Sequence, residues 1–579
     1  YYYYETPYFP CVRGATVRMV YAMRVPEIPH GYQLAAVVQN TPGVDGPWGT
    51  LPDLINPKTF DVFARLGLEP YVKIVGRHFG KTILGIFTDE AKAHGATPYT
   101  ADLFPSFKKR FGYDLRQNLY RLFGEPTDDD TIRTRIDYRL WIRDRFLNGF
   151  ARPYAKWCND HGLYLVGHFS PEDDPIEEAM TLPACMPIMQ TMGLPGCDVI
   201  VPSVGDEKSP TLNLGSLRVG SVKSQLARPY GCSETQGLND WIITSRKTRQ
   251  IYAWQKVLGV DRFFTHGFFS SNDGITNYEA PPDYGPHSSI FRGTCAVNSW
   301  LKKCDSLCDH SREVADVAIL DNVFSYWKWA PGMDLRLLQK WRNSWWLTIL
   351  HCLQSQIGIH ALYSDDAATG KLVKGGLKIG QRVYNTILVP QCGYIEKHVL
   401  EQLDKAVQAG IRVVWLGNGP QQVVARKGAF TPVTKLPGTT LASAAPLHSW
   451  LKTNLTPQVY LKGADSKNLY VRRFLGADNK EYLLAVNVSD TPLTVTLLNN
   501  HNCIWQPVAD LFDGKLTNTG GGQRWHLPGM GCAMFTIVKE VAKLPSLNTV
   551  RKTNRDRTFT RLSPNTLRLD ACTITLKGH

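Results

Sequence analysis

The chain has no run of about 18 apolar residues, the length that a membrane-spanning helix needs. It also lacks GxGxxG after an apolar run, and it lacks GxxxxGK[ST], HExxH and GxSxG. These patterns mark dinucleotide and phosphate loops, the zinc-protease helix and the serine-hydrolase elbow. The sequence therefore gives no sign of those chemistries or of a helix across a membrane.

The cysteine spacing and the net charge give no sign of a zinc site or of nucleic-acid binding. None of the 13 cysteines has the paired C-x2-C spacing of a zinc site, and Cys304-x3-Cys308 has no second pair nearby. The net charge of +14 over 579 residues is modest and does not indicate nucleic acid. With 43% hydrophobic and 20% charged residues, the composition is typical of a folded, multidomain globular protein.

The first half of the chain alternates apolar runs with helical patterns. Two strands are expected within 14–40, and helices at 56–80 and 135–162. Five short apolar runs follow this start, at 82–90, 163–172, 197–203, 227–234 and 260–269. Such alternation predicts a parallel sheet, and polar residues at the ends of its strands are typical of a TIM barrel. We predict a (β/α)8 TIM-like barrel over 1–313, with its first strands absent or within the unclear first 80 residues.

The second half predicts two smaller units. Strand-like runs such as VADVAILDN and TILVPQC, with an amphipathic helix at 395–410, predict a small α/β domain with a parallel sheet over 314–430. From about residue 457 only strands alternate, which predicts a β-sandwich within 431–540. The basic segment 541–579 is predicted to be a linker and the start of a further β-domain. The fold class is thus multidomain α/β.

An acidic pair closes the first apolar run, in Phe87-Thr88-Asp89-Glu90. Burial at a strand end raises the pKa of a carboxyl, and a glycosidase needs one protonated carboxylic acid against the leaving oxygen. Carboxylates also favour the start of a helix, so a structural role stays open. We assign Glu90 as a catalytic candidate and Asp89 to substrate binding.

Three further runs end in residues that could complete a sugar site. Glu234, in Cys-Ser-Glu-Thr, is the candidate partner carboxylate, attacking the sugar or activating a water, although a cap there is the structural alternative. His168, Glu172 and His266 are assigned to substrate binding, with Glu172 as a third candidate catalytic carboxylate. No ligand set for a metal can be assembled from the sequence, and no cofactor is required by it.

The order GKTILGIFTDE, FPSFKKRFGYDL, WCNDHGLYLVGHFSPED, RPYGCSETQG and LGVDRFFTHGFFSS resembles bacterial glycoside hydrolases. It resembles the α-L-rhamnosidases of glycoside hydrolase family 106 and their uncharacterised relatives, over about 50–540. The resemblance implies a barrel, a small glutamine-amidotransferase-like domain and a β-sandwich. It also implies Glu90 as general acid, Glu234 as second carboxylate, inversion and an associated calcium ion. A periplasmic or secreted location is implied, with the cytoplasm as the alternative.

The leading hypothesis is a glycoside hydrolase acting on a plant or microbial oligo- or polysaccharide. The alternative is a carbohydrate-binding protein or a degenerate, non-catalytic homologue. It is considered because the apolar runs account for only part of a barrel, whereas the smaller domains look intact. A third hypothesis is a basic scaffold that binds nucleic acid or anionic polysaccharide through 541–579. We predict neither a nucleic-acid nor a membrane partner. The sugar, the anomer, the linkage and the oligomeric state stay open.

Overall fold

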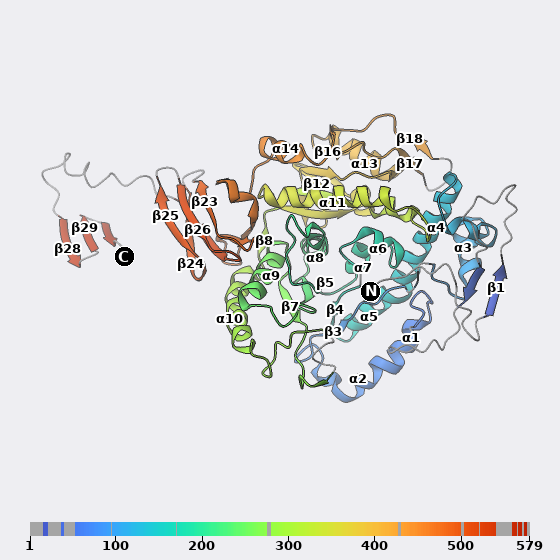
Figure 1. Cartoon of the computed structure of the whole chain (residues 1–579), viewed down its shortest axis with the longest axis horizontal. Helices are drawn as coiled ribbons and strands as arrows, with labels where there is room; N and C mark the ends of the chain where they lie inside the picture. Colours follow the sequence, from blue (N-terminus) through green and yellow to red (C-terminus); the bar gives the residue numbers. More distant parts are fainter. Residues whose placement is uncertain are drawn as a thin grey trace.

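The computed structural model describes residues 52–93, 95, 97–169, 171–274, 280–425, 430–498, 503–519 and 522–539, and the short strands at 16–20, 36–39, 559–563, 566–569 and 572–575. Figure 1 shows the barrel strands near the centre, a second α/β unit above them and a β-sandwich to one side. Within this part of the chain, no helix is long and apolar enough to cross a membrane.

Five parallel strands form the barrel part of the described chain. They are β3 (Gly85–Thr88), β4 (Tyr164–Gly167), β5 (Gly196–Val199), β6 (Cys232–Thr235) and β7 (Arg262–Thr265). β3 pairs with β4, and β5, β6 and β7 form a second sheet. Each strand overlaps one of the five predicted apolar runs. A full barrel has eight strands, so the described residues supply part of one.

Two glycines allow the barrel strands to approach closely. A Cβ on Gly167 would lie 2.0 Å from the Thr88 carbonyl oxygen, and one on Gly196 would lie 2.2 Å from the Gly167 carbonyl oxygen. These close contacts bring β4 against both β3 and β5. On the other side, the rings of Phe87 and Phe264 pack with centroids 4.9 Å apart, which joins β3 to β7 through side chains.

Helices surround these strands. Their bounds are α1 (Thr59–Phe63), α2 (Glu69–Val75), α3 (Leu103–Phe111), α4 (Asp129–Phe146), α5 (Arg152–Asp160), α6 (Pro175–Met180), α7 (Cys185–Met189), α8 (Asn213–Leu226), α9 (Ser245–Val257) and α10 (Phe291–Cys308). The helix predicted at 135–162 is α4 and α5, joined by the π-helical turn Leu147–Ala151. Asp128 caps the start of α4, and its side chain accepts a hydrogen bond from Thr131 N at 2.7 Å.

The second α/β unit is built on a five-stranded parallel sheet in the order β10-β9-β14-β16-β19. The strands are β9 (Val317–Asp321), β10 (Ile359–Tyr363), β14 (Thr386–Val389), β16 (Arg412–Leu416) and β19 (Thr439–Leu441). Its helices are α11 (Arg336–Gln354), α12 (Ser364–Thr369), α13 (Lys397–Gln408) and α14 (Leu447–Asn454). Short strands flank it: β11 (Lys371–Val373), β12 (Gly376–Ile379), β13 (Arg382–Tyr384), β15 (Tyr394–Glu396), β17 (Gln422–Val424) and β18 (Thr431–Pro432). α11 packs against α6 and α8 of the barrel part.

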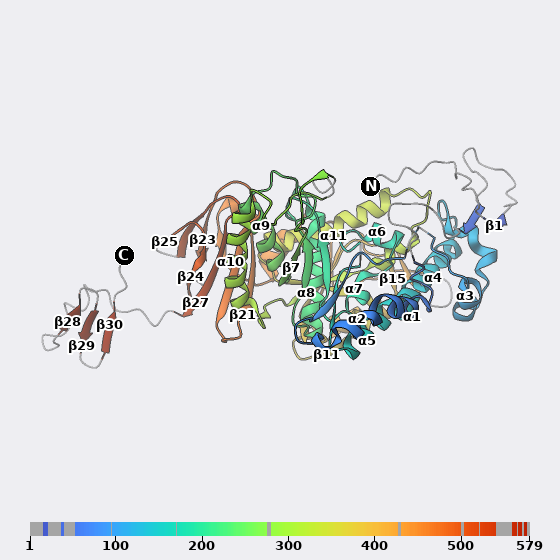
Figure 2. The ribbon, with the colours of Figure 1, turned by 90° about the horizontal axis from the view of Figure 1, so that it is seen from below.

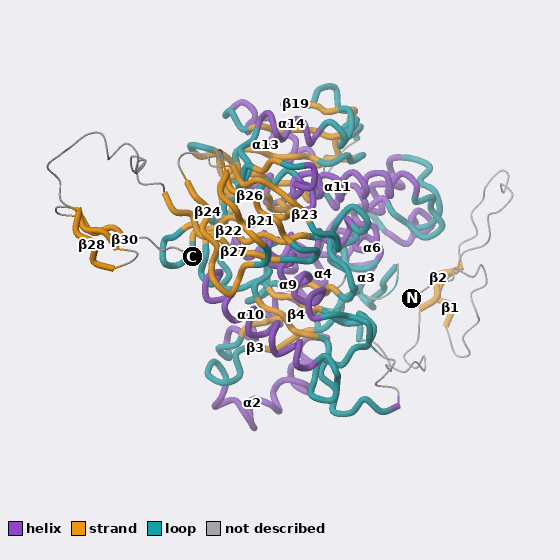
Figure 3. The backbone as a smooth tube through the Cα atoms, turned by 60° about the vertical axis from the view of Figure 1, so that its left-hand side comes forward, coloured by secondary structure: helices purple, strands orange, loops and turns teal. Residues whose placement is uncertain are grey.

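Two antiparallel sheets form the sandwich. One contains β20 (Leu461–Lys462), β23 (Leu493–Leu498), β25 (Lys515–Thr519) and β26 (Gly522–Leu527). The other contains β8 (Arg312–Glu313), β21 (Leu469–Leu475), β22 (Glu481–Asn487), β24 (Cys503–Phe512) and β27 (Cys532–Lys539). Buried Trp525 packs edge-on against Phe535 between them. Figure 3 shows these strands gathered on one side, and Figure 2 shows α9 and α10 beside them, where α9 contacts β22 and α10 contacts β24.

Short antiparallel pairings lie near both ends of the sequence. β1 (Thr16–Val20) pairs with β2 (Ala36–Gln39), in the region where two strands are predicted. β28 (Phe559–Ser563), β29 (Thr566–Leu569) and β30 (Cys572–Thr575) form a three-stranded sheet. The domain boundaries at 313, 430 and 540 stay predictions.

Candidate active site

His168 is the centre of a group of carboxyl residues at the C-terminal ends of the barrel strands. Its backbone N–H donates to Thr88 O at 3.0 Å, which fixes it just beyond β4, and its side chain is fully buried. Nε2 lies 2.9 Å from Glu234 Oε2 and 3.6 Å from Asp89 Oδ1. Nδ1 lies 3.6 Å from Glu172 Oε1. Four of the six predicted site residues therefore meet at one imidazole.

The neighbouring carboxyls favour the protonated form of the His168 ring. Burial lowers the pKa of His168, but the hydrogen bond to Glu234 and the charges of Glu172 and Asp198 outweigh burial and raise that pKa to about 9. With its proton on Nε2, the ring donates to Glu234 and holds that carboxylate in one orientation.

The carboxyls of Glu172 and Asp89 bind protons more readily than usual. Burial raises the pKa of Glu172 to about 7, against the lowering effect of His168, and its Oε1 accepts a hydrogen bond from Phe169 N at 3.0 Å. Desolvation, followed by the charge of Glu234, also raises the pKa of Asp89, although the Asp89 side chain is largely exposed. When one carboxyl keeps its proton and a neighbouring carboxyl is ionised, the first can act as the acid in catalysis and the second as the base or nucleophile.

Glu90 does not join the contacts of His168. Its φ of 44° is in the left-handed region, where the chain leaves β3. Its side chain is 45% exposed and pairs with Lys92 Nζ at 3.3 Å. The structure thus brings Asp89, rather than the predicted acid Glu90, to the imidazole. Glu90 is still near enough for its charge to act on the pKa of Asp89.

His266 directly follows β7, near enough to Asp89 for its charge to act on that carboxyl. Its backbone N–H donates to Thr235 O at 2.9 Å, and its Nδ1 is buried without a hydrogen-bond partner. A charge on His266 opposes the rise in the pKa of Asp89. The role of His266 in substrate binding stays a prediction.

Asp198 is a carboxyl that sequence reasoning missed. It lies within β5, opposite Glu234 in the parallel register of β5 and β6. Burial raises the pKa of Asp198 to about 8; His168 opposes this rise, while Glu172 and Glu234 add to it. The signal in the sequence is an acidic residue inside the apolar run that begins at Cys197.

A fully buried arginine anchors the loop that carries Glu172. Arg218 of α8 donates from Nη1 to Glu172 O at 2.7 Å and from Nη2 to Glu178 Oε2 at 2.8 Å. Its Nε donates to Asp321 Oδ2, also at 2.8 Å, at the end of β9. The second α/β unit is therefore bonded to the loop behind the carboxyl cluster and holds it in position.

The calcium ion implied by the resemblance does not fit this cluster. Ligand atoms of Asp89, His168 and Glu234 lie within 4.8 Å of one another. Calcium takes six to eight oxygen ligands, whereas these three residues offer two carboxyl oxygens and one ring nitrogen, which already lies within hydrogen-bond distance of Glu234. The second α/β unit contains another group of possible ligands, formed by Asp365, Glu396 and His398. There, the Asp365 carboxylate already pairs with a cation, because Arg143 Nη1 lies 3.1 Å from its Oδ2.

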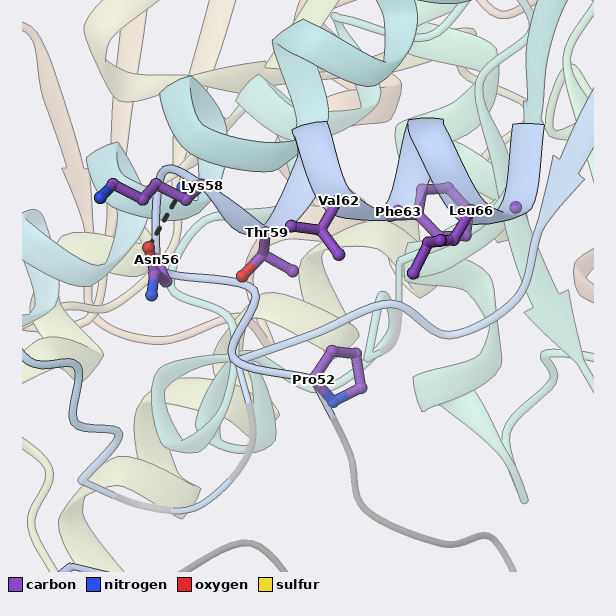
Figure 4. Close-up of a pocket in the computed structure, with 8 residues that line it drawn as sticks. Pro52, Asn56, Lys58, Thr59, Val62, Phe63 and Leu66 are labelled. Atoms are coloured by element: carbon purple, nitrogen blue, oxygen red, sulfur yellow. Dashed lines mark hydrogen bonds between the residues drawn. The ribbon is translucent and has the colours of Figure 1, made fainter. Parts of the chain in front are cut away.

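An apolar groove lies elsewhere, along α1 (Figure 4). It is lined by Pro52, Asn56, Lys58, Thr59, Val62, Phe63, Leu66 and Gly67. At its start, Lys58 N donates to Asn56 Oδ1 at 3.1 Å, in the turn where Asn56 was expected to begin a helix. The lining has no carboxyl group to protonate a glycosidic oxygen, so we place the candidate active site at the His168 cluster.

Comparison with known proteins points to carbohydrate enzymes. No protein-family model matches the chain. A curated protein from Formosa agariphila, described as a putative beta-glucuronidase, is 20% identical over 396 residues, covering 66% of this chain and 31% of that protein. The rhamnosidase from Novosphingobium sp. PP1Y superposes with a TM-score of 0.61 at 14% identity, over 86% of this chain and 48% of that one. A beta-galactosidase from Bacillus circulans sp. alkalophilus superposes with a TM-score of 0.58 at 12% identity, over 85% of this chain and 84% of that one.

These likenesses show that the chain has a glycoside hydrolase fold. The prediction of such a fold is confirmed, whereas family 106 in particular is not shown, since rhamnosidase and beta-galactosidase structures superpose similarly. The chain spans about a third of the curated relative (31%) and about half of the rhamnosidase (48%).

Proposed function

We propose that the chain hydrolyses glycosidic bonds at the carboxyl cluster around His168. The observation that carries this proposal is the pair Asp89 and Glu234, whose oxygens lie within 4.8 Å of each other on the same imidazole nitrogen. Retaining glycosidases hold their two carboxyls about 5–5.5 Å apart, and inverting ones about 6.5–9.5 Å. One oxygen of each carboxyl lies within 4.8 Å of the other, which is closer to the retaining arrangement, so we propose retention, although the family resemblance implies inversion.

The proposed reaction has two steps. In the first, Glu234 attacks the anomeric carbon while Asp89, in its protonated form, gives its proton to the departing oxygen, which breaks the glycosidic bond and forms a glycosyl ester on Glu234. In the second, Asp89 takes a proton from water, which attacks the same carbon and releases Glu234. His168 orients the Glu234 carboxylate for the attack in the first step.

For the substrate we propose an α-L-rhamnoside within an oligo- or polysaccharide, met in the periplasm or outside the cell. The rhamnosidase likeness supports this sugar, while a β-galactoside and a β-glucuronide are the alternatives named by the other relatives. The test is release of nitrophenol from the three corresponding nitrophenyl glycosides. Hydrolysis of one of them supports the proposal, and a folded chain that hydrolyses none contradicts it.

Sugar binding without turnover is the second candidate function. The described residues supply five barrel strands, and within this part of the chain β3 and β7 are joined by the Phe87–Phe264 ring contact rather than by a strand between them. Saturable binding of the same sugars in calorimetry, together with no hydrolysis, would favour this function.

Asp89 and Glu90 can be separated by a matched pair of substitutions. We expect Asp89→Asn to lower kcat/KM by about 10²- to 10⁴-fold, because it removes the proton donor next to Glu234. Glu90→Gln removes a charge that pairs with Lys92, so kcat/KM should stay within a few-fold of wild type. The reverse result in nitrophenyl glycoside assays would return the acid role to Glu90.

A further inference from the structure

Asp198 lies beside Glu234 on the neighbouring strand. The register of β5 and β6 places the two residues opposite each other. Neighbouring strands are about 4.8 Å apart, and residues opposite each other in a ladder point to the same face of the sheet. Because Glu234 on that face contacts His168, the side chain of Asp198 is directed to the same side as the cluster.

The surroundings of Asp198 suit a neutral acid. Its Oδ1 is buried and has no hydrogen-bond partner, and the residue as a whole is only partly buried. A buried carboxylate without a donor is costly, whereas the protonated form brings its own donor and no net charge.

Two carboxyls on adjacent strands do not ionise equally. His168 contacts Glu234 and favours its ionised form, whereas no donor among the described residues contacts the buried Oδ1 of Asp198. When like charges share a site, one carboxyl keeps its proton. The proton of the pair is therefore expected on Asp198.

We propose that Asp198 is a further substrate-contacting residue, a neutral carboxylic acid that donates a hydrogen bond to the bound sugar beside Glu234. The proposal rests on the proposed function. In this arrangement Glu234 supplies the negative charge of the β5–β6 pair, and Asp198 supplies a donor to an oxygen of the ligand.

The groups that face Asp198 agree with this assignment. Burial raises its pKa to about 8, and His168, at the end of β4, opposes the rise. Glu172 from the loop after β4, Glu234 from β6 and Glu90 from the end of β3 all add to it. Asp198 is thus expected to be neutral below about pH 8 and to add a negative charge beside Glu234 above it.

The first arm of the test measures stability and does not need activity. An unfolded Asp has a pKa of about 3.9, so the wild type binds more protons folded than unfolded between about pH 4 and pH 8. Its stability therefore falls relative to Asp198→Asn across that window. We expect the difference in urea-unfolding free energy, Asp198→Asn minus wild type, to rise from pH 5 to pH 8 and then level off. Asp160→Asn, at an exposed ion pair, is the matched control.

The second arm measures sugar contact on whichever nitrophenyl glycoside is hydrolysed. At pH 6, Asp198→Asn keeps a neutral donor and should keep KM within about threefold of wild type. Asp198→Ala removes the donor and should raise KM about tenfold, the effect of one hydrogen bond. An unfolding difference that does not change between pH 5 and pH 8, or an unchanged KM in Asp198→Ala, would overturn the proposal. A wild type that hydrolyses no glycoside refutes the proposed function instead, and the stability arm still decides where the proton resides.

Discussion

Glu234→Gln is expected to lower kcat/KM for glycoside hydrolysis by about 10²- to 10⁴-fold. The substitution preserves the shape of the side chain, but it replaces the oxygen anion that faces Asp89 and accepts from His168 with a neutral amide. An amide is a poor nucleophile, so the attack on the anomeric carbon should fail while the sugar can still bind. Steady-state kinetics with a nitrophenyl glycoside measure the change.

A matched control for Glu234→Gln is Glu401→Gln, on the exposed face of α13. Glu401 is 56% exposed and pairs with Lys397 at 3.7 Å, so its loss should leave kcat/KM unchanged. The unfolding midpoints of both variants should match the wild type within a few degrees. Wild-type turnover by a folded Glu234→Gln would remove Glu234 from the mechanism.

Arg218→Met is expected to lower the free energy of unfolding by about 3–5 kcal/mol. Arg218 is fully buried and binds the carboxylates of Asp321 and Glu178. These charges raise its pKa further, so it stays a cation, and its removal leaves two buried carboxyls without a positive partner. Most domains have only about 5–15 kcal/mol of stability, so the loss should be plain in urea unfolding.

Lys156→Met provides the comparison for Arg218→Met. Lys156 pairs with Asp160 on the surface, with both side chains more than half exposed, so its loss should cost at most about 1 kcal/mol. Glu178→Gln, which removes one carboxylate and keeps the arginine paired with Asp321, should fall between the two. A cost for Arg218→Met as small as that for Lys156→Met would show that the buried pairs do not hold the loop of Glu172.

The sequence predicts the strands of this fold well, for a physical reason. A strand of a parallel sheet is covered on both faces, so β4 and β9 appear in the sequence as short apolar runs between helices. The carboxyl ends of such strands lie at one edge, which predicts that His168 and Glu234 come together. Both inferences need only composition and periodicity along the chain.

Which carboxyl of an adjacent pair faces the site cannot be read from the sequence. The choice between Asp89 and Glu90 depends on the left-handed backbone at Glu90 and on its pairing with Lys92. Asp198 was missed because its role depends on the register of β5 against β6, which no local pattern specifies. Arg218 and Asp321 are 103 positions apart, and only the packing of the second α/β unit brings them together.

The stereochemistry of hydrolysis tests the central claim most directly. Proton NMR of a nitrophenyl glycoside during its first turnovers identifies the anomer of the released sugar before it equilibrates in water. With Asp89 and Glu234 within 4.8 Å, the account predicts a first product that keeps the configuration of the substrate. A first product of opposite configuration, or no release of sugar by the folded chain, would contradict it.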